Sequence, residues 1–188
     1  DILEDTANSI QVLQMCNAFA NAGFETTLLF PNKFDSIYVR DEIKSKVGGE
    51  LKFKIVLYSY SAPFNIGKSF ISCFFFFLSV AKISSNYQVF FTRHYLINHF
   101  LLRLKLNTIF EIHTIKFTSV KILNSLIRKL IIKDSKNDCQ KLIITISQKL
   151  KEYFLKNEIS PNKTIALHDG FSEEKFSKYY EITEARNR

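Results

Sequence analysis

The sequence predicts an α/β fold, built as a doubly wound, mainly parallel sheet with helices on both faces. Short apolar runs such as FKIVL and LIITI alternate with longer stretches whose apolar residues recur at helical spacing. The connections between them are short, as in chains of repeated strand–helix units. The apolar runs carry few polar residues, which is typical of parallel strands buried on both faces.

The first half of the chain is expected to begin with a helix. Asn8 or Ser9 can cap this helix, apolar residues follow at helical spacing, and Gly23 suits its end. The elements expected next are a strand over 26–30 ended by Pro31, a helix over 36–46, a strand over 52–58, a phenylalanine-rich helix reaching residue 83 and a strand over 88–91.

The second half continues the same alternation. Ser147 is well placed to cap a helix, and Pro161 breaks the chain before the last strand. The expected elements are a helix over 95–105, a strand over 108–112, a helix over 118–133, a strand over 142–146, a helix over 148–157 and a strand over 164–167.

Residues 1–176 are expected to form one domain, and residues 177–188 a polar tail or the start of a linker. A doubly wound domain usually opens with a strand, whereas this chain opens on what we interpret as the loop before its first helix. We therefore expect the chain to be clipped at both ends. Its start is acidic and polar and carries no secretory signal, so the expected location is the cytoplasm, either free or peripheral on the inner face of the membrane.

The composition narrows the class of partner and ligand. A net charge of +8 favours anionic partners: phosphate-bearing small molecules, nucleic acid or an anionic membrane surface. Nucleic acid is disfavoured, because no helix-turn-helix or other recognised module is present. Three scattered cysteines and four dispersed histidines indicate neither a disulfide framework nor a zinc site. The uncharged stretch 69–81 is shorter than the about 20 residues of a spanning helix, so we expect a buried core helix there.

Polar residues stand where three apolar runs stop, and ligands of open α/β sheets bind at such strand ends. Glu111 and His113 are two residues apart, so both side chains point to one face of their strand. Arg93 follows another strand and could hold a carboxylate or phosphate, or form a structural ion pair with Glu111 itself. Asp169 and Gly170 form an expected turn after the last strand.

Two further regions are open to alternative interpretations. Asn8 and Ser9 open the first helix, where free N–H groups attract anions or are simply capped. Residues 116–141 combine seven basic residues with an apolar helical face. That face either packs on the core, with a solvated basic back, or lies on an anionic bilayer. The members of the predicted face are Val120, Leu123, Leu126, Ile127, Leu130 and Ile131. Neither a dinucleotide-binding glycine motif nor a P-loop occurs.

Four segments, in order, resemble a known pattern. The opening from Asn8-Ser9-Ile10-Gln11-Val12 to Gly23 and Thr27-Leu28 is similar to the start of family-4-type glycosyltransferases of the GT-B fold. The other three are FFTRH at 90–94, IFEIHT at 109–114, and TISQKLKEYF followed by ALHDGFSEEKF, which ends at Phe176. The resemblance covers nearly the whole chain.

The resemblance implies the amino-terminal, acceptor-side, Rossmann-like domain of a retaining enzyme that moves a sugar from a nucleotide-sugar donor to a glycan or lipid-linked acceptor. No cofactor or bound metal is implied. His113 would point into the cleft near the donor sugar, supported by Glu111, and Arg93 would line the acceptor side. Asn8 and Ser9 would sit in the loop facing the donor phosphates. Asp169 and Gly170 would lie near the hinge to a second domain.

The chain departs from the family pattern in several places, and these departures bear on its expected activity. The family's first strand, the glycine-rich form of its first loop and the carboxyl-terminal, donor-binding domain are missing, and Gln11 stands where many relatives carry histidine. We therefore expect residues 1–188 alone to show little or no turnover. The alternative hypothesis is a non-catalytic Rossmann-like module that binds a membrane surface or a partner through the basic helix.

Overall fold

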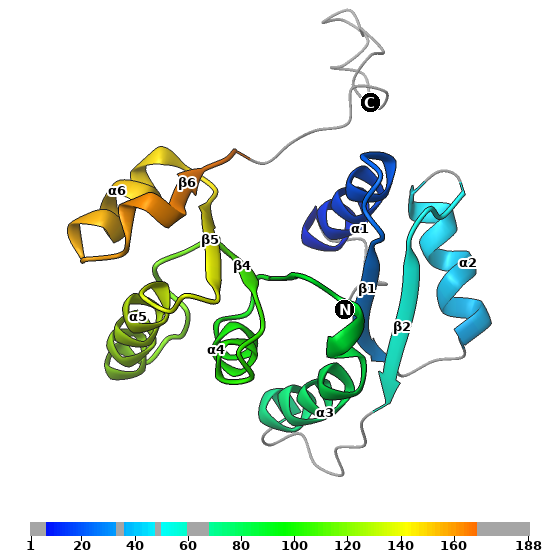
Figure 1. The fold of residues 1–188 in the computed structure, drawn as a ribbon, viewed down its shortest axis with the longest axis horizontal. Coiled ribbons are helices and arrows are strands. Elements are labelled where there is room, and N and C mark those ends of the chain that lie inside the picture. The colour runs from blue at the N-terminus through cyan, green and yellow to red at the C-terminus, as the bar shows by residue number, and fades with distance from the viewer. Residues whose placement is uncertain (1–6, 33–35, 48–49, 60–67, 169–188) are drawn as a thin grey trace, which may run out of the picture.

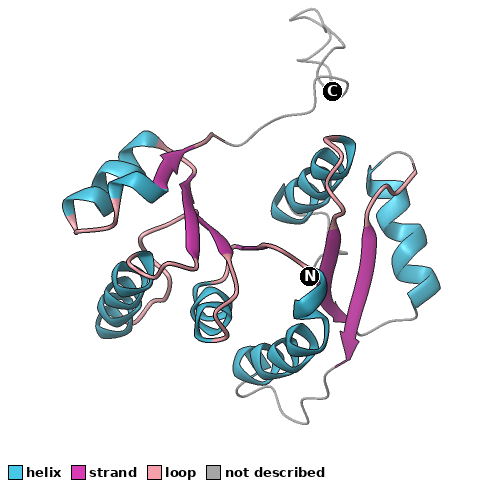
Figure 2. Cartoon of the chain, viewed as in Figure 1, coloured by secondary structure: helices cyan, strands magenta, loops and turns pink. Residues whose placement is uncertain are grey.

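The computed structural model describes residues 7–32, 36–47, 50–59 and 68–168. Helices and strands alternate along the chain, and helices flank the strands (Figures 1 and 2). The helices are α1 (Ala7–Asn21), α2 (Ser36–Val47), α3 (Lys68–Ile83), α4 (Tyr95–Arg103), α5 (Lys121–Ser135) and α6 (Gln148–Lys156). The strands are β1 (Thr27–Asn32), β2 (Lys54–Ser59), β3 (Phe90–Thr92), β4 (Thr108–Ile112), β5 (Gln140–Thr145) and β6 (Thr164–Ala166). The expected α/β class is confirmed.

All described strand pairs are parallel, and the strands form two sheets. One sheet has the order β1-β2, and the other has the order β3-β4-β5-β6. The single sheet that the sequence predicts is therefore divided between β1 and β3, which do not pair among the described residues. Side chains nevertheless join the two parts. The Tyr87 hydroxyl donates to Thr27 Oγ1 at 2.8 Å, and the rings of Phe19 and Phe91 lie 6.1 Å apart.

Each sheet has its own apolar core. Under β1 and β2 the core consists of Leu13, Cys16, Phe30, Val39, Ile43 and Phe53. Around β4 and β5 it consists of Phe110, Ile112, Ile127, Ile131, Ile143, Phe154 and Ile159. In β4, Phe110 and Ile112 belong to the core shared with α5 and α6, so strand alternation turns Glu111 to the opposite face.

Several predicted boundaries are corrected. Pro31 does not end its strand: β1 continues to Asn32, and Pro31 stands in register with Tyr58. A proline without an N–H group is tolerated on an edge strand, where one side of the backbone has no ladder bond to lose. α1 begins at Ala7, so neither Asn8 nor Ser9 takes the cap position; both lie in its first turn.

The long basic helix also departs from its prediction. α5 begins at Lys121 rather than at Thr118, because the N–H groups of Phe117 and Thr118 donate to the Asn124 side-chain oxygen at 2.7 and 3.0 Å and hold a loop there. Only part of its predicted apolar face is buried. Ile127 and Ile131 are buried, whereas the exposed members are Val120, Leu123 and Leu126.

The apolar stretch 69–81 falls within α3. Val80 is fully buried, Phe76 packs edge-on against Tyr58 of β2, and Leu78 is exposed. The end of this helix is thus a core element with one solvated side. None of the helices in the described ranges is long and apolar enough to cross a membrane.

Candidate functional site

The carboxyl ends of β3 and β4 bring three predicted residues together. β3 and β4 are parallel neighbours, with Thr92 opposite Phe110, so Arg93 and Glu111 follow side by side. Arg93 Nε donates to Glu111 Oε2 at 3.0 Å, and His113 Nε2 lies 2.6 Å from Glu111 Oε1. We call these residues the Arg93–Glu111–His113 cluster. The shared face predicted for Glu111 and His113 is confirmed.

The three side chains of this cluster are buried to different extents. The Glu111 side chain is 6% exposed, that of Arg93 15% and that of His113 30%. A nearly buried carboxylate requires hydrogen-bond donors, and both neighbours can supply them. Glu111 is thus the inner support, and His113 is the member that reaches solvent. The ion pair between Arg93 and Glu111, one of the two roles left open for Arg93, is present.

The pairing with Glu111 orients the His113 ring. When the carboxylate accepts from Nε2–H, the neutral ring presents Nδ1 as an acceptor toward its exposed side. This arrangement can accept a hydrogen bond from a hydroxyl group or take up a proton from it.

Two local features shape the loops that carry these side chains. The Thr92 hydroxyl accepts a hydrogen bond from the His94 backbone N–H at 3.1 Å, which turns the chain directly after β3. Beyond His113, buried Asn124 accepts from two loop N–H groups and donates to the Thr118 carbonyl. Sequence reasoning did not single out Asn124. The detectable signal was a polar residue three positions before Ile127, on the buried face of α5.

Cys16 of α1 lies close enough to Arg93 for the two side chains to interact electrostatically. Burial raises the pKa of the Cys16 thiol to about 11, and the positive charge of Arg93 acts in the opposite direction. Ser9, in the first turn of α1, is buried. The expectation that Asn8 and Ser9 sit in a loop is therefore wrong, although first-turn N–H groups remain unpaired within a helix. The Asn8 side chain, Asp169 and Gly170 lie outside the described side chains and residues.

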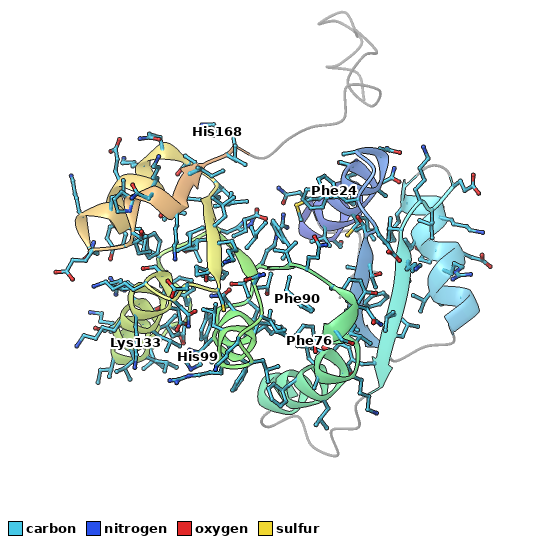
Figure 3. All side chains as sticks on the ribbon, in the orientation of Figure 1. Phe24, Phe76, Phe90, His99, Lys133 and His168 are labelled. Atoms are coloured by element: carbon cyan, nitrogen blue, oxygen red, sulfur yellow. The ribbon has the colours of Figure 1, made fainter. Side chains whose placement is uncertain are left out.

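The other two histidines of the central region, His94 and His99, are packing residues. His94 stacks on Tyr95 with ring centroids 5.1 Å apart, and burial lowers its pKa. His99 pairs with Asp134 through Nδ1 at 3.0 Å, which joins α4 to α5. Figure 3 shows His99 in the region of Lys133, away from the strands β1 and β2. Neither residue belongs to the Arg93–Glu111–His113 cluster.

A surface hollow of about 500 Å³ lies elsewhere. It is lined by the C-terminal half of α5 and the end of α6, with residues Lys129, Ile132, Lys133, Lys136, Lys156, Asn157 and Glu158. In a parallel strand–helix unit the helix returns to the amino edge of the sheet, so this hollow is at the far end of α5 from His113. No group of three or more His, Cys, Asp and Glu side chains in the described part of the chain could hold a metal ion.

No protein-family model matches the chain, and no curated protein matches it. Among solved structures, the chain is similar to Anabaena Alr3699/HepE, whose crystal structure is in complex with UDP and glucose. The TM-score is 0.61 at 8% sequence identity, and the match covers 98% of this chain. It covers 46% of that protein, so the chain spans less than half its length. The shared property is the α/β fold.

Proposed function

We propose that this chain is the acceptor-side half of a glycosyltransferase that takes its sugar from a nucleotide-sugar donor. The observation that carries the proposal is the Arg93–Glu111–His113 cluster at the carboxyl ends of β3 and β4. The similarity to a protein bound to UDP and glucose, the two parts of a nucleotide sugar, supports it. So do the four ordered segments that resemble family-4-type enzymes.

In this proposal the half contributes position and electrostatics. The cleft holds an acceptor hydroxyl against the anomeric carbon of the donor, whose bond to the diphosphate breaks as the new glycosidic bond forms. The acceptor's proton leaves with the diphosphate, and the anomeric configuration is retained. His113 accepts a hydrogen bond from a sugar hydroxyl through Nδ1. Glu111 fixes the orientation of its ring, and Arg93 lines the acceptor side while its Nε holds Glu111.

The remaining assignments belong to the same proposal. The amino end of α1, with Asn8 and Ser9, faces the donor phosphates, where free helix N–H groups stabilise negative charge. Asp169 and Gly170 mark the passage to a donor-binding domain. The enzyme transfers a hexose without a bound metal, acts in the cytoplasm, and builds a cell-envelope glycan on a glycan or lipid-linked acceptor.

The experiment that tests the proposal is a transfer assay over a set of nucleotide sugars. Residues 1–188 are assayed alone and in the complete protein, with release of nucleoside diphosphate and label in glycan as the two readouts. We expect the complete protein to couple the two readouts and the 188-residue chain to show little or no turnover. Robust transfer by residues 1–188 alone would sink the assignment as a half-enzyme. A complete protein without transfer from any donor would contradict the proposed activity.

A further inference from the structure

The outward side of α5 carries an uncommon arrangement of side chains. Ile122, Leu126, Lys129 and Lys133 are spaced at i, i+4, i+7 and i+11, so they form one stripe along the helix. All four residues are exposed, and Ile122 is the most exposed large apolar residue among them, at 77%. The stripe is about 17 Å long at 1.5 Å per residue, with its apolar half toward the amino end of the helix and its basic half toward the other.

The apolar half of this stripe extends to neighbouring side chains. Leu123 in the first turn of α5 and Val120 just before the helix are also exposed, at 44% and 55%. Single exposed apolar residues are ordinary on a protein surface, whereas four within the seven positions 120–126, at the start of α5, form a patch. The opposite face of α5 is already buried against the core through Ile127 and Ile131, so the helix has two apolar faces.

The charges around the stripe favour an anionic partner. Residues 114–133 contain five basic and no acidic residues. Asp134, the next acidic residue along α5, is buried and pairs with His99. The hollow at the basic end adds Lys136 and Lys156 to the lysines of the stripe. Its one carboxylate, Glu158, lies 3.6 Å from Lys136 and offsets one of these charges.

From these observations we infer that α5 is a membrane-docking helix that lies flat on an anionic phospholipid surface. Ile122 and Leu126 enter the boundary between headgroups and acyl chains, together with Val120 and Leu123. Lys129 and Lys133 meet lipid phosphates at the other end of the stripe. An exposed apolar patch continued by lysines, without acidic side chains, is the combination that anionic bilayers bind.

Docking in this way would place the functional site close to the membrane. The apolar end of the stripe begins a few residues after His113, because α5 follows β4 through the loop 113–120. The Arg93–Glu111–His113 cluster and the inserted side chains therefore lie toward the same end of α5. The inference stands on the α5 surface alone and does not depend on the proposed sugar transfer.

Vesicle sedimentation of the 188-residue chain tests the inference. The probes are vesicles rich in phosphatidylglycerol and vesicles of phosphatidylcholine alone. We compare Ile122→Gln/Leu126→Gln and Lys129→Gln/Lys133→Gln with two controls on other surfaces. Phe24→Gln removes an exposed apolar side chain (67%) at the end of α1. Lys44→Gln/Lys52→Gln removes two exposed lysines from the region of α2 and β2, at the opposite end of the molecule (Figure 1).

We expect the wild-type chain to sediment with the anionic vesicles, and each α5 variant to weaken the vesicle dissociation constant by about tenfold or more. The control variants should stay within about twofold of wild type. The lysine variant should also lose most of the dependence on salt concentration. All the substituted positions are exposed, so we expect every variant to fold, and circular dichroism spectra of the variants check this.

Three results would overturn the inference. The first is absence of binding to both kinds of vesicle. The second is binding that the controls weaken as much as the α5 variants do. The third is self-association that Ile122→Gln/Leu126→Gln abolishes without any vesicle binding, since a second copy of the chain would then be the partner of the patch.

Discussion

Glu111 is the residue on which the candidate site depends most. Its carboxylate accepts from Arg93 on one oxygen and faces His113 on the other, while its side chain is 6% exposed. A buried carboxylate is stable only with such partners, so the three residues form one unit. Removing the charge of Glu111 therefore affects both neighbours, and the loss appears in stability and in the orientation of His113.

We expect Glu111→Gln to lower the free energy of unfolding by about 2 kcal/mol, because Arg93 loses its charged partner in a half-buried position. Chemical denaturation measures the change. Glu25→Gln is the matched control, since the Glu25–Lys54 ion pair is exposed and such pairs contribute little. An equal loss in both variants would contradict the buried-unit description.

Cys16 is expected to be a poorly reactive thiol. It is buried, its pKa is about 11, and the thiolate is the reactive form. Iodoacetamide labelling of the native chain, followed by peptide mass spectrometry, should modify half-buried Cys139 well before Cys16. Cys16 labelled at the rate of Cys139 would show that α1 does not seal this part of the core.

Asp134 predicts a dependence of stability on pH. Burial raises its pKa, while His99, Arg103 and Lys133 act in the opposite direction. The folded state then holds this proton more tightly than the unfolded state, so its contribution to stability is present below about pH 4 and is lost as pH rises through the folded pKa.

Asp134→Asn removes this contribution. The free energy of unfolding of wild type, relative to the variant, should therefore be greatest in acid and fall toward neutral pH. Denaturation curves at several pH values measure it, with exposed Asp138→Asn as control. A wild-type advantage that grows toward neutral pH would mean that the ion pair with His99 outweighs burial.

At the scale of elements, three helices end with the same hydrogen-bond pattern. After α1, α4 and α6 one residue has positive φ: Gly23 at 91°, Lys105 at 58° and Glu158 at 67°. The chain then donates back into the helix, as Leu106 N–H does to the Leu101 carbonyl at 3.0 Å. Sequence reasoning recognised Gly23 alone, because lysine and glutamate do not mark such an end. The α4 and α6 boundaries were consequently placed one or two residues late.

Lys105→Gly should stabilise the protein by about 1 kcal/mol, because glycine adopts positive φ without the steric cost that a side chain carries. The midpoint of urea denaturation measures the gain. Lys129→Gly is the matched control in the exposed interior of α5, where the same substitution should destabilise by about 1 kcal/mol. A loss of stability with Lys105→Gly would show that its side-chain contacts matter more than its backbone.

The elements that could be predicted are those fixed by patterns of neighbouring residues. The strand over 108–112 was placed correctly, and Ser147 caps α6 by accepting from the Leu150 N–H at 3.2 Å. Such features follow from short-range patterns. The start of α5 could not be predicted, because Asn124 holds the preceding loop by contacts six and seven residues away. The exposure of Leu126 depends on which side of α5 meets the sheet.

At the scale of the whole molecule, parallel topology explains why part of the site was predictable. Polar residues after two apolar runs were expected to meet only if the runs were parallel neighbours, and β3 and β4 are. The division of the sheet between β1 and β3 is a matter of pairing that local pattern does not contain. The sequence likewise left open whether α5 packs on the core or lies on a bilayer, since the residues of its buried and exposed apolar faces alternate along the same stretch of the chain.

The rate of sugar transfer by the complete protein with His113→Ala tests directly whether the Arg93–Glu111–His113 cluster takes part in the reaction. If the cluster at the ends of β3 and β4 is the active site, kcat/KM should fall by about a hundredfold or more, as for loss of a group that handles a proton or orients a reacting hydroxyl. Tyr38→Ala, which removes an exposed ring from α2, should leave it unchanged. A wild-type rate of transfer by His113→Ala would show that the cluster is not the active site.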